Sequence, residues 1–175
     1  MSGSRNSARS QKKSMAMAAA NRKASFSRRS LGSKRALSFT SLARLANRNF
    51  SIINTTKERV PALPFLHLKE SVLGKNYELS LVISGDALAR RLNRNYRGKT
   101  YTPNVLAFPI GQKRGEIFLN LKQARRECAK RQESYRYFVA LLFVHALLHL
   151  KGYRHSRTME DKEVKLLSKF HITNT

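Results

Sequence analysis

The amino-acid sequence predicts an α/β (α+β) fold, in which a small mixed sheet packs with helices around one buried central helix. From residue 50 onward, short runs rich in Ile, Val, Leu and Phe alternate with segments of helical periodicity. Residues 137–150 form the longest apolar stretch, and its length is typical of a helix rather than a strand. The roughly 126 residues after the first 49 suffice for one compact core.

The first elements are predicted from their boundaries. A short strand is expected at 50–53, where Phe and Ile dominate. A helix should follow, because Pro61 and Pro64 suit a helix start and Gly74 suits a helix end. Residues 77–83 then predict a second strand.

The middle of the chain predicts a helix and a hairpin. Asp86 is the candidate N-cap of a helix over 87–96. After a loop over 98–104, a strand should begin at Val105 and stop at Pro109. A turn and a strand at 117–119 follow.

Three helices are expected after residue 120. The first begins at Leu121, with Ala124 and Cys128 turned inward. The second is the central helix, which should run from Ser134 to about Lys151, just before a glycine. The third covers 158–170, with Thr158 as its N-cap.

Charge points to a polyanionic partner. The 175 residues carry 35 Lys and Arg against 10 Asp and Glu, a formal charge of +25. Such a charge favours nucleic acid first and an anionic membrane surface second. No apolar run reaches the roughly 18 residues of a membrane span, so no membrane partner is expected. The single Cys128 excludes a disulfide scaffold and an all-cysteine zinc site.

Residues 1–49 are predicted to be a disordered basic tail rich in Ser and Arg, and residues 50–175 the folded domain. The tail has few large apolar residues and therefore cannot offset the entropy of ordering. It could be a phosphate-binding arm, an organelle transit peptide, or a segment that the mature protein lacks. The cytoplasm is the expected compartment, with an organelle as the alternative.

Three histidines predict a metal site. His145 and His149 are four residues apart on the central helix, so their rings project from one face. Gly152 should reverse the chain and return His155 to the same point. Three imidazoles plus a position for water form the donor set of a catalytic zinc site, so one Zn²⁺ is expected, although nickel or copper also suits imidazole.

The spacing also equals that of the metzincin proteases, whose general-base Glu follows the first histidine. Ala146 stands there instead, which weakens the peptidase interpretation. Three purely structural histidines are the remaining alternative. Bound zinc activates water and polarises phosphoryl oxygens, so a basic domain favours an RNA or DNA phosphodiester as substrate. Arg97 could neutralise the phosphate charge, and Arg90 and Arg94 repeat on its helix face, although a solvated face is equally common.

Four segments together resemble the YbeY family, the metal-dependent endoribonucleases of bacterial rRNA maturation: Asn95 to Lys99, Asn104 to Pro109, Gly115 to Ile117, and His145 to His155. The resemblance implies zinc held by the three histidines and a functionally important Arg97. It also implies hydrolysis of single-stranded RNA, including the 3′ end of small-subunit rRNA, and ribosome quality control. Small-subunit ribosomal proteins and an assembly GTPase are the implied partners.

The chain departs from the family pattern at three positions. Arg154 replaces the usual Asp before the third histidine, Ala107 replaces a Ser, and Glu116 replaces an Asp. None of these changes removes a ligand, although Arg154 takes away an acidic group beside one.

The hypothesis is therefore metal-assisted cleavage of single-stranded RNA. The histidines hold zinc, Arg97 stabilises phosphate charge, and Arg90, Arg94 and Lys99 hold the RNA backbone. One rival is a non-catalytic, zinc-containing ribosome assembly factor that binds rRNA. The other is a zinc hydrolase of another class.

Overall fold

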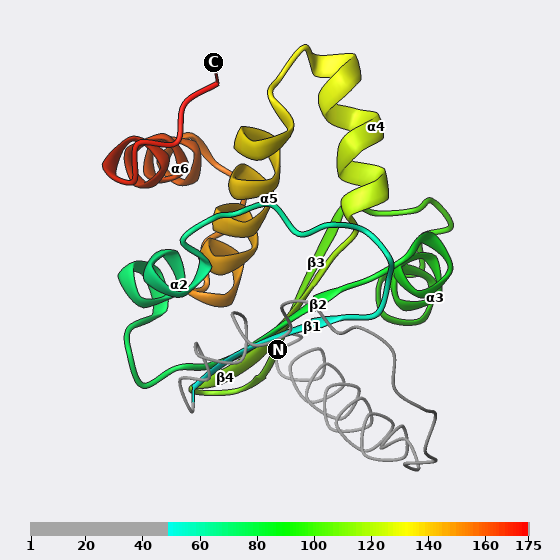
Figure 1. Ribbon diagram of the computed structural model, residues 1–175. Coiled ribbons are helices and arrows are strands. Elements are labelled where there is room, and N and C mark those ends of the chain that lie inside the picture. The colour runs from blue at the N-terminus through cyan, green and yellow to red at the C-terminus, as the bar shows by residue number, and fades with distance from the viewer. Residues whose placement is uncertain (1–48, 175) are drawn as a thin grey trace, which may run out of the picture. The chain divides into compact units, whose positions relative to one another are not determined.

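The computed structural model describes residues 49–174 (Figure 1). These residues form one mixed sheet and a set of helices, which confirms the predicted fold class. The predicted tail lies outside the described residues, apart from Asn49. The elements in chain order are β1 (Phe50–Asn54), α2 (Phe65–Leu73), β2 (Glu78–Ile83), α3 (Asp86–Arg97), β3 (Val105–Gly111), β4 (Arg114–Leu119), α4 (Leu121–Arg131), α5 (Tyr135–Leu150) and α6 (Arg157–Lys169).

The strands lie in the order β1-β2-β4-β3. β1, β2 and β4 are parallel, and β3 pairs antiparallel with β4. Parallel neighbours need crossover connections, which α2 supplies between β1 and β2, and α3 together with β3 supplies between β2 and β4. β3 and β4 are consecutive, so a tight hairpin joins them.

Different helices cover the two faces of the sheet. Leu81 and Ile117 face the main core. Most residues of α5 belong to this core. Phe118 points the other way, and its ring lies 5.8 Å from that of Phe108. The Phe108 ring in turn lies 5.2 Å from that of Tyr96 on α3. α3 therefore packs on the face opposite α5 (Figure 1).

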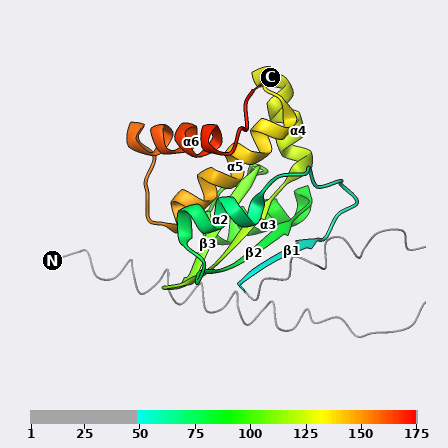
Figure 2. The same ribbon diagram turned by 60° about the vertical axis from the view of Figure 1, so that its left-hand side comes forward.

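α5 is the predicted central helix. Nine of its 16 residues are buried, because α2, α4 and α6 pack around it as well as the sheet. Ser134 caps it and accepts a hydrogen bond from the backbone N–H of Tyr137. α6 contacts α5 and lies beside it in both views, and Met159 and Leu167 of α6 are buried (Figures 1 and 2). Within residues 49–174, no helix is long and apolar enough to cross a bilayer.

Gly115 marks a close approach between β4 and the end of α5. A Cβ added at Gly115 would lie 2.7 Å from Tyr77 Oη and 3.0 Å from Leu150 Cδ2. Leu150 is the last residue of α5 and follows His149. The missing side chain thus lets this end of α5 rest directly on the sheet.

Two predicted strand ends were wrong, because β4 begins at Arg114 and not at residue 117, and β3 ends later than expected. β3 does not stop at Pro109 but continues to Gly111, with a register shift between these two residues. β3 is an edge strand, where a proline is tolerated because no neighbouring strand needs its missing N–H.

Two predicted helix caps were also wrong. Gly85 is the N-cap of α3, and Asp86 is the first helical residue, with its carboxylate engaged elsewhere. α6 begins at Arg157, so Thr158 lies inside the helix. Its N-cap is Ser156, whose side chain accepts from the N–H of Met159.

One lysine is buried in the core. Lys69 of α2 is 0% exposed, and its Nζ donates to the carbonyl oxygen of Lys75 at 3.0 Å. The same oxygen accepts a second hydrogen bond from Asn49 Nδ2. Burial lowers the pKa of Lys69, although neighbouring Glu70 partly opposes this shift.

Candidate metal centre

The three predicted histidines meet at one point. His145 and His149 lie one turn apart on α5, and His155 follows in the segment before α6. Their ring centroids are 4.5, 4.7 and 5.0 Å apart. Each offers one ring nitrogen, and these nitrogens lie within 4.8 Å of one another. His145 and His149 are half-buried, whereas His155 is exposed. Gly152, at φ +100°, takes the left-handed conformation expected of a helix stop.

The hydrogen bonds of the two helical histidines fix their tautomers. His149 Nδ1 lies 3.0 Å from the carbonyl oxygen of Tyr153, which can only accept, so this nitrogen carries the proton. His145 Nδ1 donates in the same way to Glu163 Oε1 at 2.7 Å. In each neutral ring the lone pair is therefore on Nε2.

These two Nε2 atoms face each other at 3.0 Å. Two lone pairs at that distance repel each other unless a metal ion or a proton lies between them. Tetrahedral zinc, with Zn–N distances of about 2.0–2.1 Å, sets two ligand nitrogens about 3.3 Å apart. The donor atoms, their tautomers and their spacing thus fit a divalent metal ion.

The neutral form of His149 is favoured by its surroundings. Burial is the main cause that lowers its pKa, and His145 and His155 add to the effect, while the hydrogen bond to Tyr153 opposes it. A neutral ring keeps its lone pair available as a ligand.

Glu163 is the part of the centre that the sequence did not predict. It lies on α6, and its side chain is only 12% exposed. A carboxylate behind a ligating histidine orients the ring and makes it more basic. Glu160 and Asp161 lie on the same helix and are also acidic, so the sequence does not show which carboxylate meets His145. The packing of α6 on α5 selects Glu163.

The remaining candidates lie apart from the triad. Within residues 49–174, the cluster of potential ligands consists of the three histidines and does not include Cys128. That thiol is buried and donates to the carbonyl oxygen of Arg125. Arg154, which precedes His155 in the chain, is exposed. His67 and His171 are exposed and distant from the cluster in sequence.

The predicted phosphate-binding residues gather on and after α3. Arg94 and Arg97 are exposed in its last turn, and Lys99 is exposed in the following loop. Among the described residues, no hydrogen bond or ion pair joins them to the triad. Arg90 has a local partner, because its Nε and Nη2 donate to Thr102 Oγ1 at 3.0 and 2.9 Å. Arg90 thereby fastens the loop that carries Lys99.

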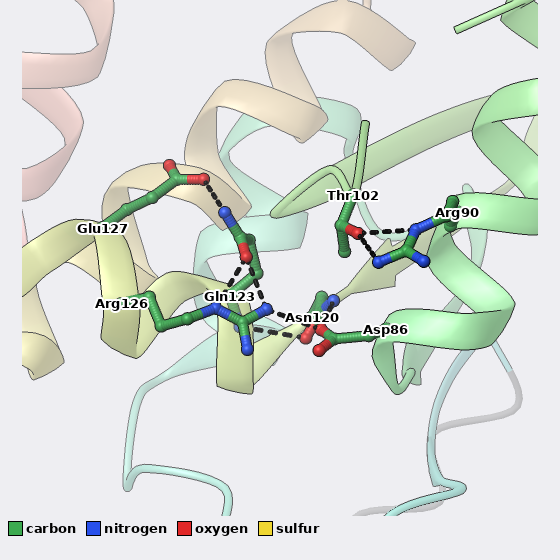
Figure 3. Close-up of polar contacts among 7 residues, drawn as sticks. All are labelled: Asp86, Arg90, Thr102, Asn120, Gln123, Arg126 and Glu127. Carbon is green, nitrogen blue, oxygen red and sulfur yellow. Dashed lines mark hydrogen bonds and ion pairs between the residues drawn. The ribbon is translucent and has the colours of Figure 1, made fainter. Parts of the chain in front are cut away.

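A second polar cluster follows the carboxyl ends of β2 and β4 (Figure 3). Asn120, 1% exposed, caps α4 by accepting from the N–H of Gln123 and donates through Nδ2 to Asp86 Oδ1. Arg126 donates to the same oxygen at 2.8 Å, and this bond is the main cause that lowers the pKa of Asp86. The cluster therefore connects α3 to α4.

The three converging imidazoles place this protein among small α/β proteins with a candidate three-histidine metal site. Comparison with known families narrows this class. The family model described as Endoribonuclease YbeY matches residues 45–174, and the chain belongs to this family.

Individual relatives agree. Endoribonuclease YbeY of Aromatoleum aromaticum is 37% identical over 93 residues, which cover 51% of this chain and 60% of the relative. The protein of the same name from Persephonella marina is 31% identical over 51% of this chain and 63% of the relative. The chain therefore spans about three fifths of the length of these two relatives. With Endoribonuclease YbeY of Helicobacter pylori the match is 32% over 62% of this chain and 84% of the relative.

A solved structure is also similar. The solution structure of TM1509 from Thermotoga maritima aligns at 21% identity and a TM-score of 0.48, over 69% of this chain and 88% of that one.

Proposed function

We propose that the protein is a zinc-dependent endoribonuclease that cleaves single-stranded RNA. The observation that carries the proposal is the pair of His145 and His149 Nε2 atoms that face each other at 3.0 Å, with both Nδ1 atoms engaged behind them. Family membership supports the choice of RNA as substrate. The formal charge of +25 supports a polyanionic substrate independently.

The chain's own residues would form the zinc site as follows. His145, His149 and His155 would hold the ion through neutral ring nitrogens, which leaves one position of a tetrahedral site free of protein ligands. Bound zinc supplies a Lewis acid for a phosphoryl oxygen and lowers the pKa of water to about 7. Glu163 keeps the His145 ring in orientation and holds the proton on Nδ1.

Cationic side chains would bind the RNA backbone. Arg97 is proposed to neutralise phosphate charge, because its guanidinium can donate two parallel hydrogen bonds to phosphate. Arg94 and Lys99 extend the positive surface beside it. Arg90 contributes charge and also fastens the loop through Thr102.

The family also suggests the biological setting. We propose that the substrate is rRNA, including the 3′ end of the small-subunit rRNA, and that the activity contributes to ribosome quality control. Small-subunit ribosomal proteins and an assembly GTPase would be partners. We expect the reaction to take place in the cytoplasm, or in an organelle if residues 1–49 act as a transit peptide.

The direct test measures cleavage of an end-labelled, single-stranded RNA by the zinc-loaded full chain. His145→Ala and His149→Ala should lose bound zinc and cleavage together. His67→Ala is the matched control, because it removes an exposed imidazole from α2 and should change neither quantity. Undiminished cleavage by both ligand variants would refute the proposal.

A second comparison separates metal binding from phosphate binding. Arg97→Ala should keep its zinc and lose about 10²–10³-fold in cleavage rate, as expected when one preorganised donor to developing charge is removed. Arg91→Ala removes an exposed charge from the same helix and is the control. Wild-type protein that binds zinc and rRNA but never cleaves would favour the non-catalytic assembly factor instead.

A further inference from the structure

A pocket of about 260 Å³ lies where α2, α5 and α6 meet. Its apolar lining comes from all three helices and from the segment between α5 and α6: Val72, Leu148, Leu166 and Tyr153. Three lysines also line it, Lys151 at the end of α5 and Lys162 and Lys165 on α6. None of its lining residues is acidic.

The pocket adjoins the candidate metal centre through Tyr153. The carbonyl oxygen of Tyr153 accepts the Nδ1 proton of His149, while the residue also lines the pocket. α6 also contributes to both sites: Glu163 contacts His145, and its neighbour Lys162 lines the pocket. The pocket and the candidate metal centre therefore share Tyr153 and helix α6.

The lining predicts the chemistry of the occupant. Three ammonium groups without an acid favour a phosphate. An aromatic ring and aliphatic side chains favour the flat face of a base, because stacking on aromatics is the usual way proteins hold unpaired bases. The volume of about 260 Å³ is below the roughly 300–1,000 Å³ of sites for drug-sized ligands, so the proposal is limited to one nucleotide.

We propose that this pocket binds one nucleotide of the RNA strand beside the cleaved bond, with the base against Tyr153 and a phosphate near the lysines. The proposal rests on the proposed function and adds a subsite to it. Lys162 already lies over the Tyr153 ring, with its Nζ 5.3 Å from the ring centroid, so charge and stacking surface are adjacent. A free mononucleotide has the same chemistry, and the experiment must distinguish it from a strand.

The test measures binding in zinc-free protein, where cleavage does not interfere. Fluorescence anisotropy gives the Kd of a labelled single-stranded 12-mer RNA at several salt concentrations. The pocket variant carries Lys151→Gln and Lys165→Gln, both exposed positions. The control carries Lys75→Gln and Lys169→Gln, which remove the same charge outside the pocket lining. Thermal unfolding by circular dichroism verifies that both variants fold.

The pocket variant should bind RNA about fivefold more weakly than the control and show a smaller salt slope, by about 0.7 for each phosphate that the protein no longer neutralises. Tyr153→Leu, which keeps the backbone carbonyl for His149, should also weaken binding. Equal Kd values for the two double variants would overturn the proposal. So would AMP that saturates the pocket in NMR titrations while RNA binding stays unchanged.

The proposed function fails separately, if zinc-loaded wild type cleaves no RNA. The binding comparison does not depend on cleavage, so it still decides whether the pocket contacts the strand.

Discussion

Replacing Glu163 by Gln tests whether the carboxylate behind His145 strengthens metal binding. The contact is short, 2.7 Å, and both side chains are largely shielded, at 26% exposure for His145 and 12% for Glu163. Glutamine can still accept the Nδ1 proton, but without charge. A charge-assisted hydrogen bond is about twice as strong as a neutral one, and a bond to a charged group contributes about 1.5–3 kcal/mol. The loss should be about 1–1.5 kcal/mol, or roughly tenfold in the zinc Kd.

Glu163→Ala removes the acceptor altogether and should cost more, toward the hundredfold end of the roughly 10–100-fold range typical of such partners. Glu160→Gln is the matched control, since Glu160 is an exposed carboxylate on the same helix. Zinc affinity is measured by competition with a chromophoric chelator at constant pH, and circular dichroism verifies the fold. If Glu163→Gln and Glu160→Gln bind zinc equally well within twofold, the carboxylate has no positioning role.

Three further predictions concern stability, measured by urea unfolding with circular dichroism because the chain has no Trp. Gly115→Ala should lower the free energy of unfolding by about 1–3 kcal/mol through overpacking, whereas Gly111→Ala, with nothing within 4 Å of its added Cβ, should stay within about 0.5 kcal/mol; equal values would contradict the close approach. Arg126→Gln should cost about 0.5–1 kcal/mol at pH 7. Because the pKa of Asp86 is lowered in the fold, the share of this cost due to Asp86 is present above its ordinary value of 3.8 and disappears as the pH falls through the lowered value, so a pH-independent cost would contradict the pairing. Lys69→Met should leave the free energy of unfolding unchanged or raise it by up to about 1 kcal/mol at pH 7, since the carbonyl oxygen that Lys69 contacts keeps a second donor. The pKa of Lys69 is lowered, so wild type gains stability as the pH rises toward 10.5, and the advantage of the variant should shrink. If Lys69→Met instead lowers the free energy of unfolding by more than about 1 kcal/mol at pH 7, the amine stabilises the core.

The sequence predicted an element well where the same local residues determine both its secondary structure and its place in the fold. α5 is an example, because a helix that is apolar on nearly all sides has to be buried, and Ser134 has the side chain that an N-cap needs. Pro109 shows the opposite case. A proline stops a central strand but not an edge strand, and the position of β3 in the sheet depends on pairing between distant segments.

The candidate site also contains residues that local rules predict and residues that they do not. His145 and His149 converge because a helix places residues four apart on one face, and Gly152 supplies the reversal that returns His155. These rules are local, so the spacing of the three histidines in the sequence was sufficient to predict that they converge. Glu163 could not be predicted, since which side of α6 meets α5 depends on how the two helices pack. The same applies to Arg90, whose partner Thr102 is set by the path of a loop.

α6 connects the proposed metal centre to the proposed RNA subsite. Met159 and Leu167 fix the helix on the core, at 1% and 2% exposure. Consecutive residues on that fixed helix then serve two environments, Glu163 the His145 ring and Lys162 the pocket. A change that loosens α6 should therefore weaken zinc binding and RNA binding together, whereas Glu163→Gln should affect zinc alone and the lysine variants RNA alone. This pattern of separate and joint losses distinguishes a shared scaffold from two unrelated surface features.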